Sequence, residues 1–224
     1  MGNTRNIIAI TEGAYPVGGA PTNRHLSYLK GLVELGNSVD LVITYPAKNQ
    51  PEQSSEPNGT FNGIRYKYTL GSTLYERNKY KRLFNRLKSV IRSVKDVKNK
   101  IIESEINTTK IIVLTTSLFD TLPFLLLAKI YNVEIFHERT EHPFINIRQS
   151  FISRLQTRVY LKYIVPHFTG VFVISHFLKA FFSHYTDNKI EIINMTVEPE
   201  RFDVKRDRDI EYIAYTGSMY TNKD

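Results

Sequence analysis

The sequence predicts an α/β domain with a doubly wound, mainly parallel sheet of the Rossmann-like type, followed by the first strand of a second α/β domain. Short apolar runs typical of buried strands alternate with helical stretches along residues 6–193, as they do in doubly wound folds. The first two runs flank a helix, an order that predicts parallel pairing with a right-handed crossover. A fresh strand at residues 210–216 ends at Gly217 with no helix behind it, which predicts the start of a second unit.

The opening unit has the clearest boundaries. Residues 6–11 form a short apolar strand, Pro21 opens a helix, Gly36 closes it, and residues 39–44 form the next strand. Proline in the first turn and glycine after the last turn are common helix boundaries. The apolar positions of this helix recur at helical spacing, at Leu26, Leu29, Leu32, Val33 and Leu35.

The alternation continues through the rest of the first domain. The polar segment 46–63 contains three prolines and is typical of a long loop. Strands are predicted at residues 64–70, 111–115, 133–136, 170–174 and 190–193, and helices at residues 77–100, 120–131, 147–165 and 175–185. The charged segment 197–209 has no strand pattern, which predicts a linker. The domains are therefore residues 1–196, the linker 197–209, and the start of a second domain at residues 210–224.

Composition excludes several classes of site. The 224 residues include no cysteine, so disulfides, thiolate metal sites and a catalytic cysteine are ruled out. The N-terminus shows no secretory signal pattern, and the apolar run 122–128 is far too short to span a bilayer, which predicts a cytoplasmic location. The net charge of +8 and the pI near 9.5 favour anionic partners such as nucleic acid, anionic lipid or phosphorylated substrates.

The first candidate site is the loop 12–24 between the first strand and the first helix. Ligands bind at the carboxyl ends of strands in open α/β sheets, and a helix N-terminus favours anions. Gly18 and Gly19 would let backbone N–H groups approach a ligand there. Their spacing is not Gly-x-Gly-x-x-Gly, so no dinucleotide fingerprint is predicted. A plain surface loop remains the alternative.

The second candidate is the segment 137–144, which follows the strand predicted at residues 133–136. It carries two histidines, two carboxylates and an arginine. A zincin would need His-Glu-x-x-His on one helix face, but Glu141 takes the place of the second histidine, so no metal is expected. A dense cluster of ionisable groups at a strand end favours a loop that contacts substrate. A solvated loop is the alternative.

The third candidate is the helix at residues 77–100. Its apolar residues fall on one face, while lysines and arginines occupy the remainder. Such a helix suits an anionic membrane surface, with Arg82, Arg86, Lys88 and Arg92 at the headgroups. A core-packing helix with a solvated basic back is the alternative. Nucleic-acid binding is not expected, because no aromatic stacking platform or base-reading motif accompanies the charge.

Ser175 precedes the helix predicted at residues 175–185. Its place at the end of a strand and the start of a helix predicts an N-cap. A nucleophilic serine would require a Gly-x-Ser-x-Gly elbow, which the sequence lacks.

Taken in order, four segments resemble the N-terminal domain of retaining glycosyltransferases of the family 4 type. These are the Gly-Gly loop with its helix and the strand ending at Thr44, the strand and helix at residues 171–179, the crossing at residues 191–202, and the strand and loop at residues 215–224. Asn37 stands where the family commonly has histidine, and residues 194–196 read Asn-Met-Thr where Pro-Asn-Gly is usual.

The resemblance implies two Rossmann-like domains that face a cleft, the GT-B fold, and transfer from a nucleotide-diphosphate sugar with retention and no obligatory metal. No cofactor is implied; the nucleotide sugar is a substrate. By this resemblance Gly18 and Gly19 approach the donor phosphate, and Gly217 and Ser218 begin the donor domain. The acceptor-side candidates are Arg24, Glu138, Arg139, Glu141 and His142, and no residue is assigned as catalytic.

The expected function is therefore the N-terminal part of a glycosyltransferase in polysaccharide or glycolipid synthesis. The expected partners are a nucleotide sugar, a glycan or lipid-linked acceptor, an anionic membrane on whose inner face the protein is peripheral, and a donor domain in cis or in trans. Without that donor domain we expect no turnover. Two alternatives stay open: a fragment of a nucleotide-sugar 2-epimerase, and a non-catalytic half-enzyme that recruits a separate donor domain to a membrane.

Overall fold

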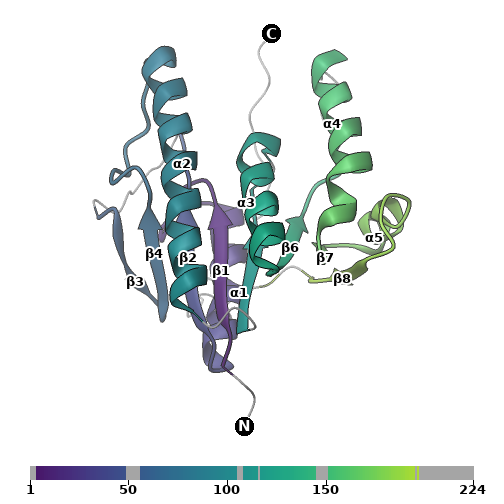
Figure 1. The fold of residues 1–224 in the computed structure, drawn as a ribbon, viewed down its shortest axis with the longest axis horizontal. Helices are drawn as coiled ribbons and strands as arrows, with labels where there is room; N and C mark the ends of the chain where they lie inside the picture. Colours follow the sequence, from purple (N-terminus) through teal and green to yellow (C-terminus); the bar gives the residue numbers. More distant parts are fainter. Residues whose placement is uncertain are drawn as a thin grey trace, which may run out of the picture.

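The computed structural model describes residues 4–48, 56–104, 108–115, 117–144, 151–194 and 196. These residues form one sheet with the strand order β3-β4-β2-β1-β5-β6-β7-β8 (Figure 1). Every neighbouring pair is parallel except β3 and β4, which are antiparallel. The chain starts in the middle of the sheet and winds outward in both directions, so the predicted doubly wound α/β fold is confirmed.

Apart from β3, the strands and helices follow one another in the order that the sequence pattern predicts. The strands are β1 (Asn6–Thr11), β2 (Ser38–Ile43), β3 (Asn58–Phe61), β4 (Ile64–Tyr68), β5 (Thr109–Val113), β6 (Glu134–Arg139), β7 (Gly170–Val173) and β8 (Lys189–Ile192). The helices are α1 (Ala20–Glu34), α2 (Lys79–Glu103), α3 (Leu118–Tyr131), α4 (Phe151–Tyr163) and α5 (His176–Phe182), with a 3₁₀ turn at Val165–His167.

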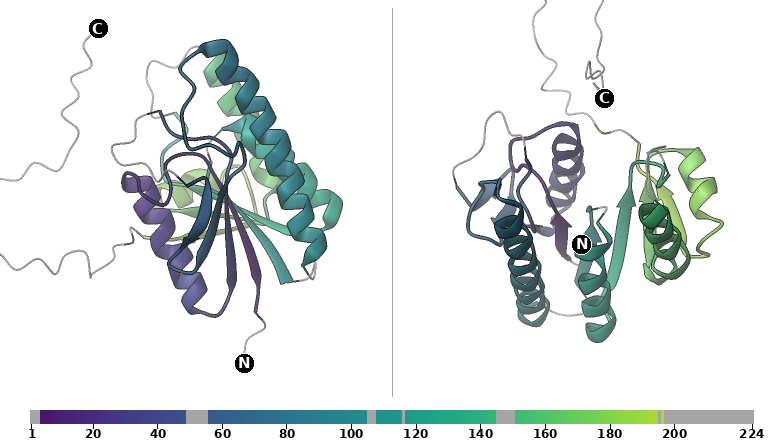
Figure 2. Two further views of the ribbon diagram at one scale, coloured as in Figure 1. Left: turned by 90° about the vertical axis from the view of Figure 1, so that its left-hand side faces the viewer. Right: turned by 90° about the horizontal axis from the view of Figure 1, so that it is seen from above.

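Helices cover both faces of the sheet. Figure 2 shows α1 on one face and α2, α3 and α4 on the other. Leu26 and Leu29 of α1 pack in one apolar cluster with the residues of β1, β2 and β4 that point toward them. Val97 of α2 and Phe124 of α3 pack in a second cluster on the opposite face. A third cluster joins α4 and α5 to β7 and β8.

Local chemistry explains several element boundaries. Gly36 has a φ of +84°, and this left-handed conformation just after α1 is one that glycine adopts at little cost. Asn132 ends α3 in the same region, with a φ of +52°. The Ser175 side chain accepts a hydrogen bond from the Leu178 N–H at 3.3 Å, which confirms the predicted N-cap.

Two of the predicted segments need correction. The prediction of one long loop at residues 46–63 is wrong, because residues 58–61 form β3, which pairs with β4 through a tight turn. Asn62 and Gly63 both have positive φ in that turn, at +50° and +78°, as a type I′ hairpin requires. The predicted end of a strand at residue 136 is also wrong. β6 continues to Arg139, and its last residues pair with Val171 and Val173.

Some predictions fall outside the described residues. These are the linker 197–209 and the start of a second domain at residues 210–224, with Gly217 and Ser218. None of the described helices combines the length and the apolar character needed to cross a bilayer.

Candidate functional site

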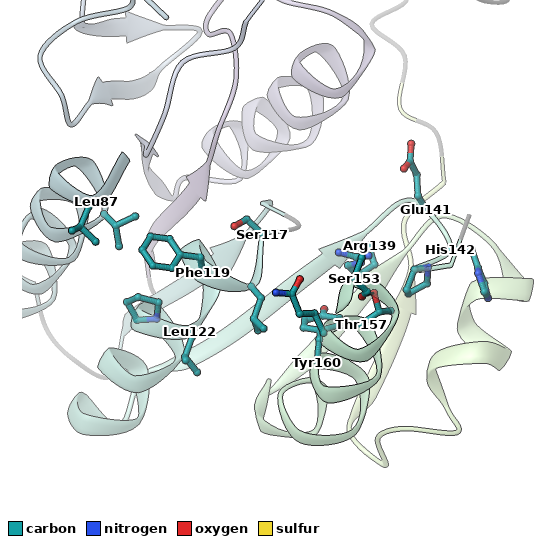
Figure 3. Close-up of a pocket in the computed structure, with 15 residues that line it drawn as sticks. Leu87, Ser117, Phe119, Leu122, Arg139, Glu141, His142, Ser153, Thr157 and Tyr160 are labelled. Carbon is teal, nitrogen blue, oxygen red and sulfur yellow. Dashed lines mark hydrogen bonds between the residues drawn. The ribbon is translucent and has the colours of Figure 1, made fainter. Parts of the chain in front are cut away.

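The carboxyl ends of the parallel strands gather along one edge of the sheet, where open α/β sheets bind ligands. Two cavities open at this edge. The first, of about 860 Å³, lies between α2, the first turns of α3 and α4, and the end of β6 (Figure 3). The second, of about 680 Å³, is lined by the segments that follow β1, β2 and β4 and by the first turns of α2. Both volumes suit small-molecule ligands.

Arg86 of α2 connects three elements at this edge. Its guanidinium group lies 3.1 Å from a carboxylate oxygen of Glu12, after β1, and 2.5 Å from one of Asp120 on α3. Burial raises the pKa of the Glu12 carboxyl, and the charge of Arg86 opposes that rise. Arg86 therefore faces the sheet edge and its carboxylates.

The other three basic residues that we expected at a membrane surface lie differently. The guanidinium group of Arg82 stands 5.6 Å from the centre of the Tyr75 ring and lines the second cavity. Arg92 donates a hydrogen bond to the Leu70 carbonyl at 3.2 Å. Lys88 is exposed. Of the four, Arg86 alone is held in ion pairs with carboxylates within the described residues.

The two loop glycines have different surroundings. A Cβ atom on Gly18 would stand 2.3 Å from the Thr22 hydroxyl oxygen and 2.6 Å from the Ala14 carbonyl oxygen, so the close packing of this loop requires glycine. Gly19 is the N-cap residue of α1 and has room for a Cβ, with the nearest atom 3.9 Å away. No side chain caps α1, which leaves its first N–H groups available to an anion. Neither glycine lines either cavity.

Glu138 is held in a buried cluster on the α1 face of the sheet. Its carboxylate accepts hydrogen bonds from Arg24 at 2.9 Å, from His25 at 2.9 Å and from the Tyr28 hydroxyl at 3.1 Å. Burial raises the pKa of the Glu138 carboxyl, but the hydrogen bond from His25 and the charge of Arg24 outweigh that effect and lower it. The carboxylate is therefore ionised and fully partnered.

Arg24 extends this cluster to the end of β8. Its two terminal nitrogens donate to the carbonyl oxygens of Ile193 and Asn194 at 2.9 and 2.8 Å. The structure thus joins two of the predicted acceptor-side residues, Arg24 and Glu138, to each other. Their hydrogen-bonding groups are occupied within the protein, so both hold α1, β6 and the chain after β8 together.

The other three predicted acceptor-side residues line the first cavity (Figure 3). Arg139 is buried, and its guanidinium group lies 5.4 Å from the centre of the Tyr160 ring. Glu141 is exposed at the rim. The His142 ring packs 4.3 Å, centre to centre, from the Phe181 ring. Among the described residues, no group of three or more histidine, aspartate or glutamate side chains is arranged to hold a metal ion.

Sequence reasoning missed several residues of this edge. His25 and Tyr15 continue the Glu138 cluster, with the Tyr15 hydroxyl 2.5 Å from the His25 ring, and Tyr160 lies against Arg139. Tyr45 and Tyr75 line the second cavity with their rings edge to face, 5.9 Å apart. Tyr45 directly follows a strand predicted from the sequence, and this placement at a strand end could have marked it as a candidate site residue. The pairing of His25 with Glu138 has no local signal.

Comparisons with known proteins bear on the fold. No protein-family model matches the chain, and no curated protein matches it. The chain is similar to the crystal structure of a glycosyltransferase from Rickettsia africae ESF-5, with a TM-score of 0.52 at 14% identity. The match covers 90% of this chain and 45% of that protein, so the chain spans less than half of the length of this structural neighbour. The shared feature is a glycosyltransferase-like fold.

Proposed function

We propose that the chain forms the acceptor-side domain of a retaining glycosyltransferase. The enzyme moves a sugar from a nucleotide-diphosphate sugar to an acceptor hydroxyl, in polysaccharide or glycolipid synthesis. The observation that carries the proposal is the combination of a fold like that of a glycosyltransferase with two cavities at the carboxyl edge of the sheet.

The residues at this edge have chemistry that suits an acceptor. Glu141 and His142 stand at the first cavity, where a carboxylate and an imidazole can hydrogen-bond the hydroxyl groups of a sugar. The uncapped N-terminus of α1 offers N–H groups to the donor diphosphate. Positive charge and N–H groups near a departing diphosphate stabilise the charge that develops in the transition state. The remaining donor contacts come from a second domain, in cis or in trans.

The first half of α2 supports contact with an anionic membrane. Its large apolar side chains are 48–72% exposed, and they are Tyr80, Leu83, Phe84, Leu87 and Ile91. Exposed lysines and arginines flank them, among them Lys81, Lys88 and Arg92. An amphipathic helix of this composition binds at the headgroup boundary of an anionic bilayer. We propose a peripheral association that brings the domain to a membrane-borne acceptor.

Transfer activity tests the proposal. The protein expressed from the complete reading frame that encodes this chain is incubated with membrane lipid extract and a panel of radiolabelled nucleotide sugars. We expect label in the lipid or glycan product, with the anomeric configuration of the donor retained. Glu141→Gln should lower transfer, whereas Glu103→Gln, an exposed glutamate at the far end of α2, should leave it unchanged.

The same assay separates the alternatives. A 2-epimerase would change the sugar within the nucleotide sugar without any acceptor, which chromatography of the nucleotide pool detects. A recruiting half-enzyme would show transfer only after a separate donor domain is added. If no acceptor becomes labelled under any of these conditions, the glycosyltransferase proposal is refuted.

A further inference from the structure

The first cavity is lined by a buried charge that has no counterion among the described residues. Arg139 is 7% exposed and makes no ion pair with any described residue, and its Nε atom has no hydrogen-bond partner among them. The hydroxyl group of Tyr160, which is 6% exposed, also lacks a partner there. A buried charge is costly unless an opposite charge or hydrogen bonds compensate it. Arg139 and Tyr160 both line the cavity, so an anion in the cavity would supply what they lack.

The groups around Arg139 leave its positive charge uncancelled. His137 points to the same face of β6, two residues earlier, and donates a hydrogen bond from Nδ1 to the Val113 carbonyl at 3.0 Å. Burial and the nearby charge of Arg139 lower the pKa of His137 to about 3, so its ring is neutral at pH 7. Glu141 is exposed at the rim, and its carboxylate points away from Arg139 (Figure 3).

The opposite end of the same cavity is apolar. Leu87 of α2 and Phe119 and Leu122 of α3 line it, and they are 48%, 52% and 39% exposed. Leu87 continues into the exposed apolar face of α2, which includes Phe84 and Ile91. Figure 3 shows the order along the cavity: the apolar side chains on α2 and α3, then Arg139 and Tyr160, and then Glu141 and His142.

We propose that this cavity binds a lipid phosphate, with the phosphate at Arg139 and Tyr160 and the hydrocarbon chain along Leu122, Phe119 and Leu87. The chain would leave the cavity at the apolar face of α2, where that face meets the bilayer. Glu141 and His142 lie beyond the phosphate, in place to contact a sugar carried on it. An inorganic phosphate or a nucleotide would leave the apolar end uncovered. That this lipid phosphate is the acceptor rests on the proposed function. That the cavity binds a lipid phosphate does not depend on that function.

Calorimetric titration with decyl phosphate, below its micellar concentration at pH 7.5, tests the site. Two probes carry one half of the ligand each: tetraethylene glycol monodecyl ether has the chain with neither anion nor sugar, and inorganic phosphate has the anion without the chain. We expect decyl phosphate to bind at least tenfold more tightly than either. Arg139→Gln should weaken decyl phosphate binding tenfold or more, because the anion loses its counterion. Arg158→Gln removes the same charge from an exposed position on α4 outside the cavity and should change nothing.

Each outcome either supports or overturns the inference. Equal binding of decyl phosphate and tetraethylene glycol monodecyl ether would show that only the hydrocarbon chain matters. Equal loss of decyl phosphate binding in Arg139→Gln and Arg158→Gln would show that only the net charge matters. Equal binding of inorganic phosphate would show a free-anion site. If Arg139→Gln fails to fold, Tyr160→Phe provides the test, with threefold or more weakening for decyl phosphate alone. If the protein transfers sugar to a non-lipid acceptor and does not bind decyl phosphate, this inference is refuted and the proposed function stands. If it binds decyl phosphate and transfers no sugar, the proposed function is refuted and this inference stands.

Discussion

The two faces of β6 carry neighbouring charges that are equally buried and differently partnered. Glu138 is 3% exposed and faces α1, where three side chains hydrogen-bond its carboxylate. Arg139 is 7% exposed and faces α4, where it contacts the ring of Tyr160 and makes no ion pair with a described residue. The α1 face is closed by its own groups, whereas the α4 face is a cavity.

We interpret this difference as that between a structural charge and a charge available to a ligand. A buried ion cluster whose groups are all satisfied holds elements together and has nothing left to offer a ligand. A buried cation without a counterion has a large unused capacity to bind an anion. Two adjacent residues with the same sequence signal thus differ in their surroundings: Glu138 is partnered within the protein, whereas Arg139 lines the cavity that we propose to bind an anion.

The largest expected effect is the loss of the Glu138 charge. Glu138→Gln leaves Arg24 buried without a counterion, and breaking a buried pair in this way costs about 3–5 kcal/mol. Urea unfolding followed by circular dichroism measures the change. Glu191→Gln is the control, since its ion pair with Lys189 is exposed and screened by water. An equally small change in both variants would show that the Glu138 cluster does not stabilise the fold.

His137 lies on the same face of β6 as Arg139 and should make the stability of the fold depend on pH. Its folded pKa of about 3 lies below the value of about 6.5 for an unfolded histidine. The unfolded chain therefore binds the proton first, so stability is intact above about pH 6.5 and falls as the pH decreases from there toward 3. We expect a loss of about 1.6 kcal/mol between pH 6.5 and 5, a window that lies above the pH range in which the lowered pKa of Glu138 acts.

Unfolding curves at these two pH values measure that loss. His137→Gln should reduce it, because an amide side chain does not titrate. His176→Gln, at an exposed position on α5, should keep the wild-type loss. The same loss in wild type and His137→Gln would place the titrating group elsewhere.

We expect a smaller loss of stability from a substitution in the loop that precedes α1. Gly18→Ala forces a methyl group against the Thr22 hydroxyl and the Ala14 carbonyl, and overpacking of this kind costs about 1.5 kcal/mol. Gly19→Ala is a matched control, because the nearest atom to its added methyl is 3.9 Å away. Thermal unfolding of the two variants should separate them. If both substitutions are tolerated, the α1 face is less closely packed at this loop than the structure shows.

Apart from β3, the sequence predicted the order of strands and helices correctly, because each buried strand and amphipathic helix carries its own pattern. β3 was missed because it is short and half exposed and begins with Asn58 and Gly59, which are poor strand formers. The end of β6 was missed because charged residues are rare inside a sheet. The partners that make Glu138 acceptable lie on α1, far away in the sequence.

The helix α2 shows a second limit of local pattern. The same apolar periodicity runs along its length, but Val97 and Ile101 are buried in the core while Leu83 and Phe84 are exposed. Which half is covered depends on how far the helix extends beyond the elements packed against it, and that is a property of the assembled fold. The sequence could therefore predict the amphipathic helix and could not choose between a core face and a membrane face.

The smallest expected change in stability is the most informative about the cavity. Arg139→Met replaces a buried cation that has no ion pair among the described residues with an apolar side chain of similar length. We therefore expect the free energy of unfolding to stay within about 1 kcal/mol of wild type or to rise. Decyl phosphate should raise the melting temperature of the wild type by binding only the folded state, and should leave that of Arg139→Met unchanged. A loss of stability as large as that of Glu138→Gln would show that Arg139 is partnered within the protein, and the two faces of β6 would then be alike.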